Sequence, residues 1–184
     1  RSTLFPYTTL FRSACAKIIG ITLAAFIFNG INERTIQFGY NKEDCKKYSK
    51  AKKISYAPTC FMLIDKSVFF DVGLMDEKYF VYYDDTDFVF RSQKLCKRLF
   101  YIPEPKMQHK ESVCTGKRSD FSYRFTYRNR IYFISKHRKF WKLKYFAQIM
   151  YDACIRKIRM RKNKTQYKII SKALRDGYML GAAK

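Results

Sequence analysis

The sequence predicts an α/β fold in which short apolar strands alternate with helices, followed by a basic helical region. The clearest pattern is the apolar run from Tyr56 to Ile64, which predicts a buried strand and leads directly into a helix signal. Asp65 is a typical N-cap residue and Gly73 a typical helix stop, so a helix should cover Lys66 to Val72. The chain is 47% hydrophobic, which is enough to build a core and argues against disorder.

Before this strand the sequence is less decisive. Residues 14–28 are apolar and could form a helix or a strand, and the polar residues 29–53 predict a long loop with at most one short strand. Residues 1–13 resemble a translated sequencing-library adapter, so we expect them to be foreign to the natural fold. The predicted organisation is therefore a catalytic-domain portion over residues 14–137 and a basic helical tail over residues 138–184.

After Gly73, caps and apolar spacing predict three further elements. A helix should begin at Asp84 or Asp85 and run to about residue 97, and residues 98–102 should form a strand that Pro103 ends. Ser119 should cap a helix that ends near residue 137. The side chains expected to face inward on the first helix are Phe88, Leu95 and Cys96. The second helix carries aromatic side chains near helical spacing: Phe121, Phe125, Tyr132 and Phe133.

The formal net charge of +23 requires an anionic partner or surface, such as nucleic acid, anionic lipid or a nucleotide-sugar. Residues 136–175 carry 14 Lys or Arg against one acid and interleave them with apolar side chains. This segment could lie on an anionic membrane or pack on the core, and nucleic-acid binding is a weaker alternative because no known module supports it. The six scattered cysteines suggest reduced thiols and a cytoplasmic location, and the longest apolar run, residues 18–28, is too short to cross a bilayer.

The acidic residues are concentrated in one short stretch. Six of the 15 lie between Asp71 and Asp87, including Asp84 and Asp85. Three explanations are open: the carboxylates cap a helix, they hold divalent ions, or one of them is a general base whose neighbours raise its pKa.

This stretch resembles the second half of the catalytic domain of family 2 glycosyltransferases, and of rhamnosyltransferase-like members in particular. The resemblance covers about residues 26–137 and rests on SYAPTCFMLIDKSVF at 55–69, VGLMDEKYFVYYDDTDF at 72–88 with Arg91, YIPEP at 101–105, and YRNR at 127–130. It implies a GT-A fold with a mixed sheet and flanking helices. It also implies inverting transfer of a sugar from a nucleotide-sugar donor to an acceptor hydroxyl.

The resemblance assigns unequal roles to the acids. It makes Asp85 the catalytic base, while Asp84 orients the segment and joins Asp76 and Glu77 on the acceptor side. Asp87 is expected to cap the helix or to pair with the arginine four residues later. His109 is implied as a ligand of a divalent cation, Mg²⁺ or Mn²⁺, that holds the donor diphosphate.

One part of the family pattern is missing. No Asp-x-Asp sequence precedes Asp85, so we expect a truncated gene product that is inactive by itself because it lacks the donor-binding half. The expected acceptor is a glycan or a lipid-linked sugar. The expected location is the cytoplasm, either free or as a peripheral protein on the inner membrane face. The alternative is a non-catalytic basic module that binds an anionic membrane surface or nucleic acid.

Overall fold

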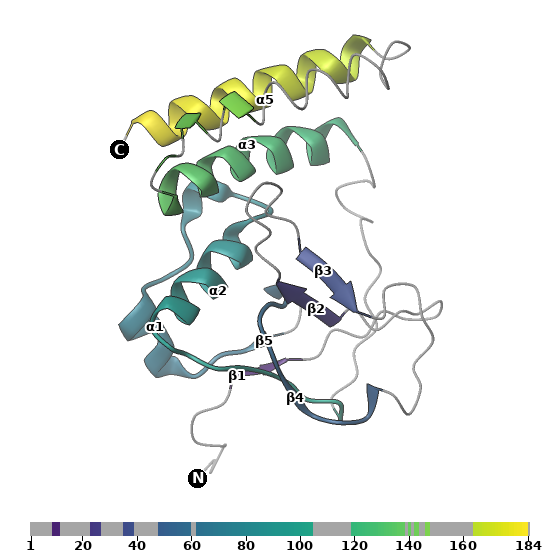
Figure 1. Cartoon of the computed structure of the whole chain (residues 1–184), viewed down its shortest axis with the longest axis vertical. Helices are drawn as coiled ribbons and strands as arrows, with labels where there is room; N and C mark the ends of the chain where they lie inside the picture. The colour runs from purple at the N-terminus through teal and green to yellow at the C-terminus, as the bar shows by residue number, and fades with distance from the viewer. Residues whose placement is uncertain are drawn as a thin grey trace. The chain divides into compact units, whose positions relative to one another are not determined.

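The structure is a computed structural model, and it describes residues 9–11, 23–26, 35–38, 48–59, 62–104, 119–138, 140, 142–143, 146–147 and 164–183. In these ranges five short strands come first, followed by two helices with a short 3-10 helix between them, a sixth strand, and two long helices (Figure 1). The chain divides into two compact units. The first contains residues 1–77 and 84–111, and the second contains residues 78–83 and 112–184. The fold is therefore mixed α/β, as predicted.

The first unit contains two small sheets. Four strands pair in the order β4-β6-β1-β5: β4 (Lys52–Ile54), β6 (Leu99–Tyr101), β1 (Thr9–Phe11) and β5 (Met62–Leu63). This sheet is mixed, because β1 runs parallel to β6 while the β4–β6 and β1–β5 pairs are antiparallel. The second sheet is the antiparallel pair of β2 (Leu23–Phe26) and β3 (Thr35–Phe38). Within residues 14–28 the described part is thus a strand.

Helix α1 (Lys66–Val72) confirms the predicted boundaries. The Asp65 carboxylate accepts a hydrogen bond from the backbone N–H of Ser67 at 2.8 Å, which satisfies one free donor of the first turn. At the other end Gly73 has a φ of 80° and donates its N–H to the carbonyl of Phe69 at 3.0 Å. Any residue with a side chain would be strained at this φ, so glycine at position 73 favours the end of the helix here.

Helix α2 (Asp84–Lys94) begins where predicted but ends three residues early. Cys96 adopts a φ of 56°, its N–H bonds to the carbonyl of Gln93, and the N–H of Lys97 bonds to the carbonyl of Ser92. These two bonds are the Schellman pattern, which closes a helix with a left-handed residue. The prediction that Leu95 and Cys96 face inward is therefore wrong: both are exposed.

The strand predicted from Tyr56 to Ile64 is also shorter than expected. Among its described residues only Met62 and Leu63 pair in the sheet, as β5. Pro58 has no N–H to give to a strand ladder, and the chain before it is nevertheless buried, with Tyr56 7% and Ala57 2% exposed. These two side chains join the core of the first unit, whose other buried members are Ile54, Val89, Leu99 and Tyr101.

Residues 29–53 were expected to contain at most one short strand, and this is wrong because β3 and β4 both fall there. In β4 only Ile54 is buried, while Lys52 and Lys53 are exposed. A strand with a single inward side chain leaves almost no apolar pattern in the sequence. It forms because its backbone pairs with β6, which is distant in the chain.

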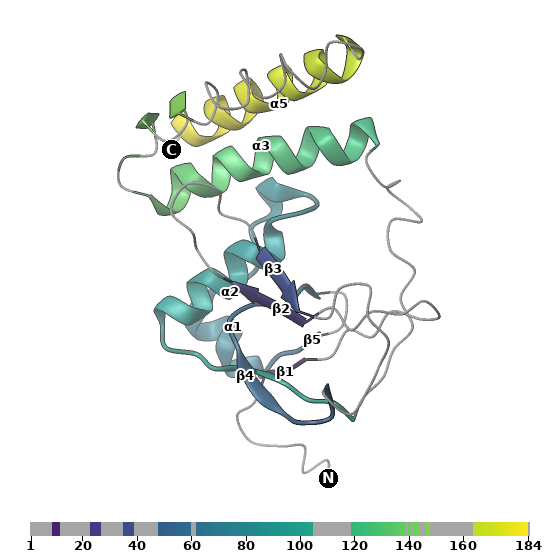
Figure 2. The ribbon, with the colours of Figure 1, turned by 45° about the vertical axis from the view of Figure 1, so that its right-hand side comes forward.

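The second unit is built on α3 (Asp120–His137) and α5 (Lys164–Ala182), which lie side by side in both ribbon views (Figures 1 and 2). Ser119 caps α3 as predicted, and its hydroxyl accepts from the N–H of Ser122 at 3.1 Å. Of the aromatic side chains at helical spacing, Tyr132 and Phe133 are buried, whereas Phe121 in the first turn is 39% exposed. The core between the helices includes Ile131, Ile170 and Leu174, with Tyr123, Tyr127 and Tyr178 packed against it.

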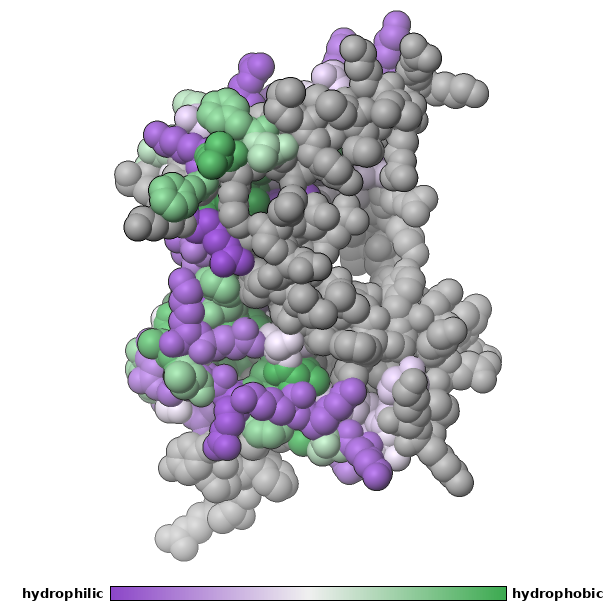
Figure 3. Space-filling model, viewed as in Figure 1, coloured by the Kyte–Doolittle hydropathy of each residue, from purple (hydrophilic) through white to green (hydrophobic). Residues whose placement is uncertain are grey.

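Gly177 marks the closest approach of α5 to α3. A Cβ atom at this position would lie 2.3 Å from the carbonyl oxygen of Arg128 and 2.9 Å from the Cβ of Ile131. Only glycine allows the two backbones to come this close. At the surface, hydrophobic side chains of the described residues lie in small groups between hydrophilic ones on the face drawn in Figure 3.

Candidate active site around Asp85

Asp85 lies in the first turn of α2, where its carboxylate is half-buried. Its Oδ2 accepts a hydrogen bond from the hydroxyl of Tyr56 at 2.9 Å. Its Oδ1 accepts from the backbone N–H of Thr86 at 2.6 Å and from the Thr86 hydroxyl at 3.2 Å. A carboxylate held by three donors at a helix start is fixed in orientation, which is a requirement for a group that must meet a substrate proton.

The surroundings make Asp85 a better base than an ordinary aspartate. Burial raises its pKa most, and the neighbouring charge of Asp84 raises it further. The hydrogen bonds from Tyr56 and Thr86 act in the opposite direction and leave a net increase in the pKa. Burial and the charge of Asp85 also raise the pKa of Tyr56 well above its usual range, so this phenol keeps its proton and remains a donor.

The other predicted acceptor residues differ in exposure. Asp84 is half-buried and starts α2, Asp76 is half-buried in the preceding loop, and Glu77 is exposed at the start of the short 3-10 helix η3 (Glu77–Tyr79). Asp84 is close enough to raise the pKa of Asp85 by its charge. For Asp76 and Glu77, contact with an acceptor stays a prediction.

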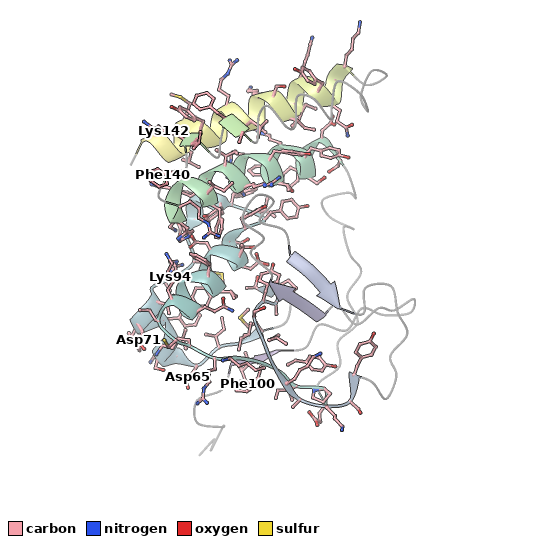
Figure 4. The ribbon with its side chains drawn as sticks, viewed as in Figure 1. Asp65, Asp71, Lys94, Phe100, Phe140 and Lys142 are labelled. Carbon is pink, nitrogen blue, oxygen red and sulfur yellow. The ribbon has the colours of Figure 1, made fainter. Side chains whose placement is uncertain are left out.

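Asp87 has a structural role, which confirms its predicted pairing. Its side chain is completely buried, and its Oδ2 accepts from the Nε of Arg91 at 2.7 Å. The guanidinium of Arg91 also donates to the carbonyl of Val72, and to the carbonyl of Leu74 at 2.7 Å. The two carbonyl bonds tie α2 to the chain that leaves α1, and the ion pair engages the Asp87 carboxylate, so Asp87 is not available as a base. A second ion pair in this unit joins Asp71, labelled in Figure 4, to Lys97.

In the second unit, residues 78–83 form a loop that the sequence did not indicate. Phe80, Tyr82 and Tyr83 have φ values of 65°, 62° and 67°. Positive φ is costly for bulky side chains and persists only where the surroundings hold the backbone in place. The loop directly precedes the acidic pair in the sequence, at Asp84.

Asn129 on α3 holds this loop. Its side chain is completely buried, and its Nδ2 donates to the carbonyls of Tyr79, Val81 and Tyr82 at 2.9, 2.6 and 2.8 Å. Arg128 adds bonds to the carbonyls of residues 78 and 79, at 2.7 and 2.8 Å, and its Nε donates to the Asn129 Oδ1 at 2.8 Å. In the sequence these two residues stood out only as part of the YRNR motif.

Two predicted features cannot be placed. His109 lies outside the described residues, so its role as a ligand stays a prediction. In the part of the chain that is described, no group of three or more His, Cys, Asp or Glu side chains is arranged to hold a metal ion. The divalent cation, Mg²⁺ or Mn²⁺, likewise stays a prediction.

Comparisons with family models, with curated proteins and with solved structures find no match for this chain. Within the described ranges no helix has the length and apolarity to cross a membrane. The functional argument therefore rests on the geometry around Asp85.

Proposed function

We propose that the chain is part of an inverting glycosyltransferase in which Asp85 is the general base. The observation that carries the proposal is the half-buried Asp85 carboxylate, which is oriented by Tyr56 and Thr86 and has a raised pKa. Such a carboxylate can accept the proton of an attacking hydroxyl as the new bond forms, and general bases work best when their pKa approaches the working pH.

The proposed reaction is a displacement at the anomeric carbon of the donor sugar. The acceptor oxygen forms a bond to the anomeric carbon of the donor sugar, and its proton moves to a carboxylate oxygen of Asp85. The bond from the anomeric carbon to the diphosphate breaks, and the nucleoside diphosphate leaves with the electron pair. Attack from the face opposite the leaving group inverts the anomeric configuration.

The remaining residues take supporting roles in this proposal. Asp84 raises the basicity of Asp85 by its charge and, with Asp76 and Glu77, offers carboxylates to the hydroxyls of a glycan or lipid-linked acceptor. His109 would be one ligand of a Mg²⁺ or Mn²⁺ ion, which neutralises charge on the departing diphosphate. The nucleotide-sugar would be held mainly by a preceding half of a GT-A fold.

The test uses the gene extended upstream of residue 14, with release of nucleoside diphosphate measured for a panel of nucleotide-sugars. Asp85→Asn keeps the shape of the side chain but cannot accept the proton. We expect it to lower kcat by about a hundredfold to ten-thousandfold while donor affinity stays the same. The matched control is Asp71→Asn, an exposed carboxylate at the end of α1, which should leave kcat unchanged.

A variant Asp85→Asn that keeps more than about a tenth of the rate would rule out the base assignment. If neither the extended wild type nor the variant releases nucleoside diphosphate from any donor, the alternative of a non-catalytic basic module is favoured.

A further inference from the structure

The segment that follows α3 displays large apolar side chains at its surface. Phe140, Leu143 and Phe146 are 68%, 72% and 58% exposed. They recur at every third residue; Phe140 lies in a turn, while residues 142–143 and 146–147 are helical. Phe140 and Lys142, labelled in Figure 4, lie just beyond the end of α3.

The same segment is strongly cationic. Residues 138–164 contain ten Lys or Arg and a single acid, Asp152. Four of the basic residues fall among the apolar ones, within residues 138–147, where there is no acid: Arg138, Lys139, Lys142 and Lys144. Any surface that accepts this segment must therefore offer both an apolar layer and a high density of negative charge.

The two parts of the basic tail differ in how far their apolar side chains are buried. Helix α5 directs its apolar residues, including Ile170 and Leu174, into the core with α3, where they are 0% and 2% exposed. Packing on the protein, one of the two alternatives for the basic tail, therefore describes α5. Phe140, Leu143 and Phe146 differ from these residues because most of their surface is exposed, which favours the membrane alternative.

We propose that Phe140, Lys142, Leu143 and Phe146 form a docking surface for an anionic lipid bilayer. Phe140, Leu143 and Phe146 enter the boundary between headgroups and acyl chains, and Lys142, with the basic residues that neighbour it in the sequence, binds lipid phosphates. A leucine has no ring to stack on a base, and a nucleic acid offers no apolar layer for it, so the combination fits lipid better than DNA or RNA. This inference does not depend on Asp85.

The chain carries its own probe for this surface, because its single tryptophan is Trp141. The experiment mixes the full chain with vesicles of phosphatidylcholine alone, or with about a third of phosphatidylglycerol. Binding is measured by co-sedimentation, and insertion by quenching of the tryptophan fluorescence with brominated lipid. We expect binding and quenching with the anionic vesicles, and both should weaken as salt rises.

Two sets of variants separate the contributions. Replacing Phe140, Leu143 and Phe146 by Ser should lower vesicle affinity by at least about tenfold and abolish the quenching. Replacing Lys139, Lys142 and Lys144 by Gln should lower the affinity on the order of a hundredfold. The matched control is the pair Phe70→Ser and Leu74→Ser, which are 78% and 76% exposed elsewhere and should change nothing.

Three results would overturn the proposal. The first is unchanged affinity of the Ser variant, which would reduce the binding to charge alone. The second is anionic binding without quenching by brominated lipid. The third is release of the protein from vesicles by duplex DNA at equal phosphate concentration, combined with full DNA affinity of the Ser variant. That result would make nucleic acid the partner. Each readout is independent of sugar transfer, so its failure leaves the role of Asp85 unaffected.

Discussion

Replacing Asn129 by Leu should destabilise the second unit by an amount that the hydrogen bonds allow us to work out. The change keeps the number and branching of the heavy atoms of a completely buried side chain but removes the amide that serves three carbonyls. Tyr79 keeps its bond from Arg128, so the loss falls mainly on the carbonyls of Val81 and Tyr82. At about 1 to 1.5 kcal/mol for each buried bond, the free energy of unfolding should fall by about 2–3 kcal/mol.

The assay is urea unfolding followed by circular dichroism, with the free energy extrapolated to water. Asn129→Asp gives a second arm, because it places a carboxylate against the same carbonyls. The Asp variant should lose more free energy of unfolding than the Leu variant at neutral pH. This difference should shrink in acid, where the carboxyl regains a proton to donate. Lys168→Leu, at an exposed position of α5, is the control and should change stability by less than about 0.5 kcal/mol. A Leu variant within about 0.5 kcal/mol of wild type would refute the view that this amide holds the loop.

Three further predictions concern single positions. Gly177→Ala should lower the free energy of unfolding by about 2–3 kcal/mol in the same assay, because its Cβ would meet the Arg128 carbonyl, and an unchanged value would contradict the close approach of the helices. Cys96→Gly should raise the free energy of unfolding by about 1 kcal/mol, since glycine adopts the left-handed φ without strain. A lower free energy of unfolding would show that the Cys96 side chain stabilises the fold by more than its backbone strain destabilises it. Asp85→Asn should alter the pH dependence of thermal unfolding. Because burial raises the folded pKa of Asp85, wild type loses stability as pH rises from the ordinary pKa of an aspartate, about 3.9, through the folded pKa, and the variant does not. The variant should therefore gain on wild type as the pH rises above the ordinary value. A constant difference would mean that the charged carboxylate is not disfavoured in the folded state.

The features that the sequence predicted correctly are those that neighbouring residues determine. Asp65 and Gly73 bound α1, Ser119 caps α3, and Arg91 is one helical turn from Asp87, so each contact could be anticipated from spacing alone.

The features that the sequence missed depend on distant contacts. The early end of α2 requires a left-handed backbone conformation at Cys96, and cysteine is not a residue type that predicts this conformation. The left-handed aromatic residues of the loop at 78–83 are held by Asn129, which lies almost fifty residues further along the chain. Strand β4 forms by pairing with β6, although its own residues are mostly lysine and exposed.

The same division applies to the candidate site. The concentration of acids pointed to this stretch and the family resemblance to Asp85, but the phenol that fixes its carboxylate was not anticipated. Tyr56 lies 29 residues earlier and meets Asp85 only once the core has formed. In the sequence it stood out only as the start of an apolar run and as part of the motif at residues 55–69.

The position of β1 in the larger sheet has a practical consequence. Residues 9–11 pair with β6 on one side and with β5 on the other, and both ladders use backbone groups that any sequence can supply. A chain shortened to begin at Ala14 would uncover two strand edges at once. Uncovered edges recruit strands from other molecules, so such a shortened protein would be prone to aggregation or strand exchange.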